Sequence, residues 1–228
     1  TGAVAAAIRS PLREQTGLTG KVVIGMTYTV IGYFMSKYYA RFRKTYPQIA
    51  VEIRELARPA LERQLARGDL DIALMLVSNL ENRDDLEQEV LLRSSRRLWL
   101  SADHPLLSRS EISLADVAKE DYVMLTIDEA SSTAGRYWEA AGLSPRAVLT
   151  TSSVEAVRSL VAAGVGVTVL SDMVYRPWSL EGQRIELRRL IEPVPSMDVG
   201  LAWARERPIN GAAATFRAFM SVTMGGGG

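Results

Sequence analysis

The chain has 228 residues and 47% of them are apolar, so one large or two smaller α/β domains could each bury a complete hydrophobic core. Its 27 lysines and arginines nearly balance its 26 aspartates and glutamates, which excludes an overall electrostatic attraction to DNA or to an anionic membrane. Cysteine is absent and His104 is the single histidine, which excludes disulfides, thiol nucleophiles, thiolate metal sites and zinc sites built from several histidines.

The two ends of the chain differ from its middle. Residues 1–20 begin with an Ala-rich helix former, Pro11 interrupts it and a loop follows, so we expect the end of a linker helix and a loop. Because the chain begins with Thr1 and not with methionine, we expect an upstream part to be missing. Residues 225–228 are all glycine and predict a flexible tail.

The first half of the sequence predicts a βαβαβ unit. A β-branched run at residues 22–26 predicts a buried strand, and an apolar stripe predicts one helix over residues 31–46 with a solvated basic face. Alternating residues 49–56 predict a second strand, and Pro59 fits the first helical residue after it. That helix stops at Gly68, a left-handed cap, before a third buried strand.

The same helix-to-strand joint occurs twice more, at Gly142 and Gly164, which indicates a parallel α/β protein with right-handed crossovers. One long strand is expected within residues 91–107, with a crossing to a second lobe near Leu98 to Ala102, and a return crossing is expected within residues 197–206. We therefore predict lobe I from residues 21–99 plus 202–224 and lobe II from residues 100–201. A cleft between them, at the carboxyl ends of parallel strands, is where such sheets bind ligands.

At this point the sequence resembles the effector-binding domain of LysR-type transcriptional regulators. The segments that carry the resemblance cover residues 21 to about 220 in the family's order: KVVIGMTYT, ARFRKTYPQIAVEIRE, LARGDLDIAL, LSADHPL, ISLADVAKEDYVML, TTSSVEAVRSLVAAGVGVTVLS and WARERPIN. The resemblance implies an α/β fold of two Rossmann-like lobes joined by a two-crossing hinge, like type II periplasmic binding proteins, with a small effector in the cleft.

The resemblance also implies effector contacts in both lobes. Carried over position by position, they are Thr27, Tyr28, Thr29, Thr126, Ile127, Ser152 and Ser153. Hydroxyls and backbone N–H groups at helix N-termini are donors without a formal charge, which suits a carboxylate, a sulfate or a similar anion. Met75, Leu76 and Val77, where the third strand ends, are expected to add an apolar wall.

Several of these residues have a plain structural interpretation. Ser152 with Glu155 fits a capping box, and Thr29 fits an N-cap, whereas Thr27 is the better candidate for ligand contact. His104 fits a surface turn, the Asp69 and Asp71 pair fits a local turn, and the cluster Arg93, Arg96 and Arg97 fits a solvated edge.

The resemblance implies a regulator with these partners: a small effector, expected to be an organic or inorganic anion, DNA through a missing N-terminal winged helix-turn-helix, and a second copy in a homodimer, or a tetramer at full length. No apolar run approaches the roughly 20 residues that cross a bilayer, so we expect no membrane partner and a cytoplasmic protein. We expect no cofactor and no metal.

Two other classes compete with the regulator. A periplasmic solute-binding protein of an ABC transporter would have the same fold. A small enzyme would need an acid, a base or a nucleophile in the cleft, and the sequence contains no recognisable catalytic motif, so we expect no enzyme.

Overall fold

The computed structural model describes residues 18–225, so the predictions for residues 1–17 and for the last three glycines lie outside the described residues. The chain divides into two compact units. Unit 1 is built from the described residues up to Leu92 and from Val199 onward, and unit 2 is Arg93–Asp198. The predicted boundaries between the lobes follow residues 99 and 201, whereas the boundaries between the units follow residues 92 and 198.

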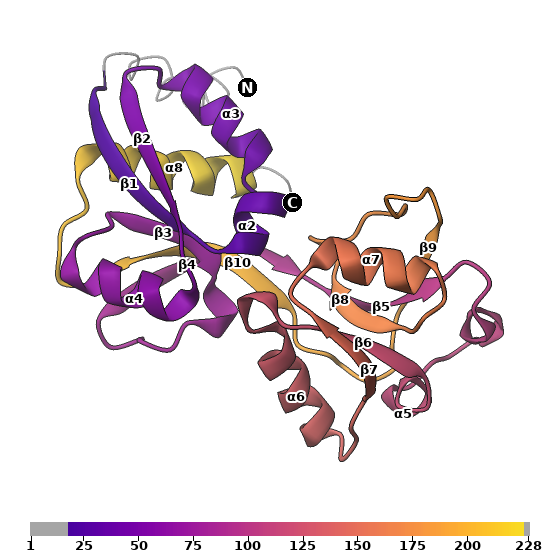
Figure 1. The fold of residues 1–228 in the computed structure, drawn as a ribbon. Coiled ribbons are helices and arrows are strands. Elements are labelled where there is room, and N and C mark those ends of the chain that lie inside the picture. Colours follow the sequence, from indigo (N-terminus) through magenta and orange to yellow (C-terminus); the bar gives the residue numbers. More distant parts are fainter. Residues whose placement is uncertain (1–17, 226–228) are drawn as a thin grey trace, which may run out of the picture. The chain divides into compact units, whose positions relative to one another are not determined.

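Unit 1 contains a five-stranded sheet with the order β2-β1-β3-β10-β4 (Figure 1). β1 pairs in parallel with β2 and with β3, as the sequence predicted, whereas β10 runs antiparallel to β3. The elements of this unit are β1 (Gly20–Met26), α2 (Tyr28–Tyr33), α3 (Ser36–Thr45), β2 (Ile49–Glu55), α4 (Arg58–Arg67), β3 (Ile72–Leu76), a 3-10 turn (Val77–Asn79), β4 (Leu86–Ser94), β10 (Met197–Ala204) and α8 (Gly211–Gly225). β4 and β10 each run across the boundary between the units.

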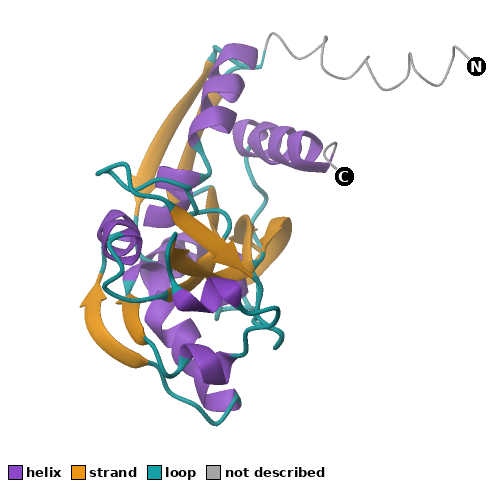
Figure 2. Cartoon of the chain, turned by 90° about the vertical axis from the view of Figure 1, so that its right-hand side faces the viewer, coloured by secondary structure: helices purple, strands orange, loops and turns teal. Residues whose placement is uncertain are grey.

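Two helices on this sheet are joined by aromatic packing. The Phe42 ring of α3 makes edge-on contacts, 5.2 Å between centroids, with Phe216 and with Phe219 of α8. Figure 2, where α8 leads to the mark C, shows the two helices beside one another. Leu61 and Leu65 of α4 belong to a hydrophobic cluster with Ala73 and Met75 of β3, and both leucines are fully buried.

The single helix predicted over residues 31–46 is wrong. The chain forms α2 and α3, separated at Phe34 and Met35, because both amide groups of this pair donate to the carbonyl of Val30 in one widened turn. Phe34 and Met35 are 5% and 2% exposed, so burial of both side chains accompanies the break. The apolar periodicity continues through it, which is why the sequence pattern did not reveal it.

Unit 2 contains a three-stranded sheet with the order β8-β5-β9 and a parallel pair, β6 and β7. Its elements are β5 (Arg96–Ser101), a 3-10 turn (Pro105–Ser108), α5 (Leu114–Val117), β6 (Asp121–Leu125), a 3-10 turn (Ile127–Glu129), α6 (Ala130–Ala140), β7 (Arg146–Thr151), α7 (Val154–Ala162), β8 (Thr168–Ser171) and β9 (Ile185–Arg188). The long strand predicted within residues 91–107 is wrong, because it breaks at Ser95 into β4 and β5, which belong to different sheets.

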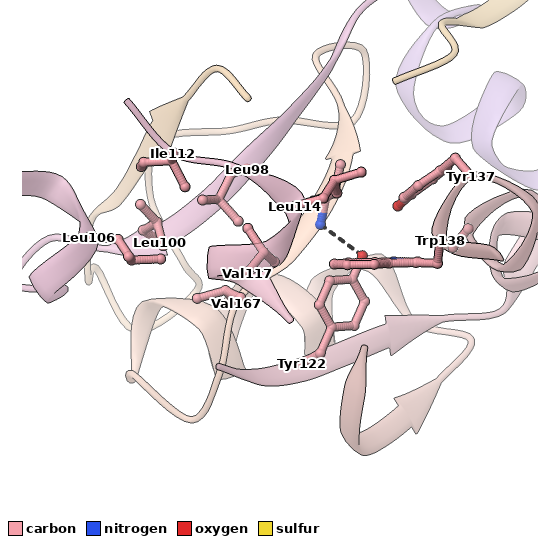
Figure 3. Packing of buried hydrophobic residues seen from close by; sticks show 12 residues of the cluster. Leu98, Leu100, Leu106, Ile112, Leu114, Val117, Tyr122, Tyr137, Trp138 and Val167 are labelled. Carbon is pink, nitrogen blue, oxygen red and sulfur yellow. Dashed lines mark hydrogen bonds between the residues drawn. The ribbon is translucent and has the colours of Figure 1, made fainter. Parts of the chain in front are cut away.

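The core of unit 2 is built around two aromatic side chains (Figure 3). Tyr122 and Trp138 are 1% exposed, and their rings meet edge-on with centroids 5.9 Å apart. The Tyr122 hydroxyl accepts a hydrogen bond from the Val169 amide at 3.0 Å, drawn as the dashed line in Figure 3. This bond connects β6 to β8. A parallel bridge between Tyr122 and Val167, the residue before β8, shows that the two segments run in the same direction.

The three glycine joints that the sequence predicted are confirmed. Gly68, Gly142 and Gly164 have φ values of 82°, 66° and 74°, in the left-handed region that glycine adopts without steric penalty because it has no Cβ atom. Each follows a helix that leads into a strand. Among residues 18–225, no helix has the length and apolar character needed to cross a membrane.

Candidate functional site

The polar residues of unit 1 gather where β1 and β3 end. Met26 lies opposite Leu74 in the parallel pair, so the carboxyl ends of both strands reach the same edge of the sheet. Residues 27–29 follow β1 there, and the 3-10 turn Val77–Asn79 follows β3. The structure therefore brings the two groups of candidates in this unit together.

Thr27 differs from an ordinary helix cap. It occupies the N-cap position of α2 with extended backbone angles, but its side chain makes no capping bond. The residue is 2% exposed, and its Oγ1 atom is buried with no hydrogen-bond partner among the described residues. A buried hydroxyl without a partner costs about 1–3 kcal/mol, so this atom is the least satisfied polar group at the edge.

The other residues after β1 have different environments. Tyr28 is 37% exposed at the start of α2. The interpretation of Thr29 as an N-cap is wrong, because Thr29 is the second residue of α2 and is 3% exposed. α2 has six residues, so its dipole is short and any affinity for an anion would come from individual donors.

The predicted apolar wall lies mostly inside the core. Met75 is fully buried and belongs with Val77 to the cluster that packs on α4, and Leu76 is 4% exposed. Packing accounts for all three side chains. They fix the position of the strand end and do not line an open surface.

The polar residues of unit 2 gather where β6 and β7 end. Leu125 lies opposite Thr151 in this parallel pair, and the Thr126 amide donates to the Thr151 carbonyl at 2.9 Å. Thr126 and Ile127 follow β6, while residues 152–153 follow β7. These four candidates therefore share one edge of their unit.

The capping box predicted for Ser152 is wrong. The N-cap of α7 is Ser153, whose Oγ accepts from the Ala156 amide at 3.1 Å. The helix starts one residue later because the Thr151 hydroxyl holds the Ser153 amide at 3.1 Å and leaves Ser152 in the turn. Ser152 is exposed, so it is the freer hydroxyl of the two.

A feature that the sequence did not reveal follows Ile127. Asp128 and Glu129 both have positive φ, 48° and 63°, and are the only two non-glycine residues with positive φ in the described part of the chain. Such residues cost about 1–3 kcal/mol each and gather at functional sites. Aspartate tolerates this conformation, but a glutamate after it gives no sequence signal of a turn. Both side chains are half-buried.

Other candidates have structural roles. The His104 Nδ1 atom accepts from the Leu106 amide at 3.2 Å and starts a 3-10 turn. The Asp71 carboxylate accepts from the Val23 amide at 2.7 Å and from the Asn210 side chain at 2.8 Å, so it ties β1 to the start of α8. Within residues 18–225, no three histidine, cysteine or acidic side chains are arranged to hold a metal ion.

The arginine cluster does not act as one surface. Arg93 lies 3.7 Å from Asp198, and Arg97 pairs with Asp172 at 3.0 Å. Arg96 donates to the carbonyls of the segment before β10, at 2.9 Å for Ser196, and burial lowers its pKa below the usual value. All three arginines therefore have partners within the chain, and only Arg93 has a mostly exposed side chain, so the cluster does not form one solvated edge.

The fold and the two polar edges define the class of the protein. Two α/β units crossed twice by the chain, each with polar residues after its parallel strands, are typical of ligand-binding domains of the type II periplasmic-binding fold. The family model described as LysR substrate binding domain matches residues 15–224, so the chain belongs to this family. It is thus an effector-binding domain of the LysR type, and the alternative of an ABC-transporter solute-binding protein is set aside.

Curated relatives agree with this family. The uncharacterized HTH-type transcriptional regulator YybE of Bacillus subtilis strain 168 is 25% identical over 202 residues, which cover 88% of this chain and 67% of that protein. The transcriptional regulator AlsR of the same strain is 28% identical over 177 residues, which cover 74% and 56%. The chain thus spans between about half and two thirds of these regulators.

Solved structures share the fold. The C-terminal domain of a probable LysR family regulator from Rhodococcus sp. RHA1 superposes with a TM-score of 0.81 at 27% identity, covering 90% of this chain and all of that one. Neighbours under 20% identical include QuiR with shikimate (TM-score 0.75, covering 92% and 99%), Synechocystis PCC6803 CcmR with 2-PG (0.77, 90% and 98%) and BenM with benzoate (0.76, 90% and 93%). At this identity they show the fold alone.

Proposed function

We propose that this effector-binding domain senses a small molecule with an anionic head group, which Thr27 holds in unit 1. The observation that carries the proposal is the buried Thr27 hydroxyl, which has no partner among the described residues. A carboxylate oxygen within reach would satisfy that hydroxyl without a counter-charge. Benzoate and shikimate, held by two structural neighbours, are carboxylates and support this choice.

We propose a set of effector contacts in unit 2 as well. Thr126, Ile127, Ser152 and Ser153 follow the parallel strands of that unit, at the edge where such sheets bind ligands. The free energy of effector binding can shift a regulator only as far as the effector prefers one state of that regulator over the other.

The proposal extends to the whole regulator. The matched relatives are HTH-type transcriptional regulators of greater length, so we assign DNA binding to a winged helix-turn-helix outside residues 1–228. We assign self-association as a homodimer to this domain and tetramers to the full-length protein, acting on DNA in the cytoplasm. A regulator of this kind binds and releases its effector unchanged and has no catalytic role.

A thermal-shift screen tests the effector site. The screen heats three proteins with organic acids, inorganic anions, sugars and amino acids: wild type, Thr27→Val and Thr45→Val. Thr45→Val is the control, because Thr45 is the last residue of α3 and is not a proposed contact. A ligand at one hundred times its Kd adds about 2.7 kcal/mol, a shift of roughly 5–10 °C for a domain of this size. The proposal predicts an acid that stabilises wild type and Thr45→Val but not Thr27→Val. A hit that is indifferent to Thr27→Val contradicts it.

A further inference from the structure

The chain passes between the two units twice, and the strands that carry these crossings are neighbours. The first crossing leads from β4 through Ser95 into β5, and the second leads from residues 189–196 into β10. β4 and β10 are adjacent in the sheet of unit 1. They approach closely there, because a Cβ atom at Gly200 of β10 would collide with the Glu89 carbonyl oxygen of β4. In unit 1, backbone pairing therefore holds the two crossings together.

In unit 2 a side chain connects the two crossings. β4 ends at Ser94, and β5 enters a different sheet with β8 and β9. Residues 189–196 belong to no helix or strand, so their backbone groups need other partners. The Nη1 atom of Arg96, the first residue of β5, donates to the carbonyl oxygens of both Pro195 and Ser196, at 2.9 Å for Ser196. A single guanidinium nitrogen thus bonds the second crossing to the first.

The first crossing is itself fixed to the end of β8. The Ser94 and Ser171 hydroxyls are both buried, and their oxygen atoms are 2.6 Å apart. The Asp172 amide donates to the Ser95 carbonyl at 2.9 Å. These bonds hold the first crossing in unit 2 without any arginine. The second crossing is connected to β8 through the first, by way of Arg96.

We infer that Arg96 joins the two crossings so that they bend as one hinge, which restricts the range of arrangements open to the two units. Arg93 has a smaller part, because its side chain is 75% exposed and lies 3.7 Å from Asp198. Hinges are formed by a few residues at the ends of elements, which is where Arg96 and Ser196 lie. A restricted hinge leaves less conformational freedom for an effector to remove, so it favours binding.

The distance between two labels measures that range directly. The chain has no cysteine, so Arg63→Cys in α4 and Glu139→Cys in α6, both exposed positions, place one nitroxide label in each unit. Double electron–electron resonance on residues 1–228 then gives the distribution of distances between the labels. Arg96→Met should broaden this distribution. It should also speed amide hydrogen exchange in peptides that span the crossings about tenfold or more, as expected for the loss of hydrogen bonds from a charged donor.

Arg188→Met is the matched control. Arg188 of β9 also donates to two backbone carbonyls, those of Leu107 and Arg109, which belong to the segment around the 3-10 turn Pro105–Ser108. This variant should speed exchange at that turn and leave the distance distribution unchanged. A second variant, Arg96→Lys, keeps the positive charge, but its side chain is too short to place a nitrogen at the position of Nη1. It should broaden the distribution as Arg96→Met does.

The outcomes separate a hinge from general packing. Circular dichroism first establishes which variants are folded, and Arg96→Lys decides the test if Arg96→Met does not fold. A broader distribution with wild-type width in Arg188→Met supports the inference. An unchanged width in the folded Arg96 variants overturns it, and so does equal broadening by Arg188→Met, because the effect would then come from a general loosening of unit 2. The site proposed at Thr27 is independent of this result, since the ligand screen tests it separately.

Discussion

Replacing Thr27 by valine should stabilise the free protein. Valine has nearly the same shape as threonine and lacks the hydroxyl, which in this fold is buried without a partner among the described residues. In wild type, folding removes that hydroxyl from water and gives no bond in return. The substitution removes this cost and leaves the packing at the start of α2 unchanged.

The expected gain follows from the burial. Thr27 is 2% exposed, so nearly the full penalty of an unsatisfied hydroxyl applies, about 1–3 kcal/mol. Valine and threonine are both β-branched, so their side-chain stiffness is similar and the lost hydroxyl is the main difference. We take the lower end of the range as the net gain, about 1 kcal/mol, which corresponds to roughly 2–4 °C in Tm. Thr27→Val should at the same time weaken effector binding roughly tenfold or more, since a hydrogen bond to a charged group contributes about 1.5–3 kcal/mol.

Urea unfolding followed by circular dichroism measures the gain, with Thr168→Val as the opposite case. Thr168 is fully buried, but its hydroxyl donates to the Val123 carbonyl at 2.9 Å, so its loss should cost about 1 kcal/mol. The two substitutions are chemically identical and should change the free energy of unfolding in opposite directions. Destabilisation by Thr27→Val to the same degree as by Thr168→Val would refute the reasoning, because the Thr27 hydroxyl would then have a partner in the folded protein.

Three further predictions concern stability. Glu129→Gly should raise Tm by roughly 2–4 °C in a thermal melt, because glycine removes about 1 kcal/mol of strain at φ 63°; an unchanged or lower Tm would show that the turn is not strained. Arg158→Met should lower the free energy of unfolding in urea by roughly 2–3 kcal/mol, since the buried guanidinium bonds Glu155 and two backbone carbonyls, and a loss under 1 kcal/mol would contradict this. The Ser113 amide and hydroxyl lower the pKa of Asp116 to about 2, so its stabilising effect is complete above about pH 4 and is lost as the pH falls toward 2. Melts of Asp116→Asn should therefore differ from wild type at pH 6 and approach it at pH 2, and a constant difference would contradict the assignment.

Local rules predicted much of the fold. β1 and β3 were visible as short apolar runs, because strands covered on both faces need apolar side chains on both. The left-handed glycines at 68, 142 and 164 were visible because few other residues accept that conformation after a helix. The grouping of polar residues after parallel strands followed from the direction of those strands, and the structure brings each group together within its own unit.

The failures have a common cause. The break at Phe34 and Met35, the break at Ser95 and the cap at Ser153 all depend on which neighbour takes a backbone amide or carbonyl. Apolar periodicity does not contain that information. The same holds for the Thr27 hydroxyl, since only the structure shows that no described group bonds it. The left-handed turn at Asp128 is another tertiary effect, for which the residue types give a weak signal.

The sheet of unit 1 is completed late during synthesis of the chain. β10 lies between β3 and β4, yet its residues leave the ribosome only after all of unit 2. Until then β3 and β4 lack the neighbour that joins them, and their unpaired backbone groups can bind another strand. Unit 2 is one continuous segment and can complete its own contacts first. A nascent chain of this protein is therefore most exposed to aggregation in the interval between the two appearances of unit 1, when its inserted half is already folded.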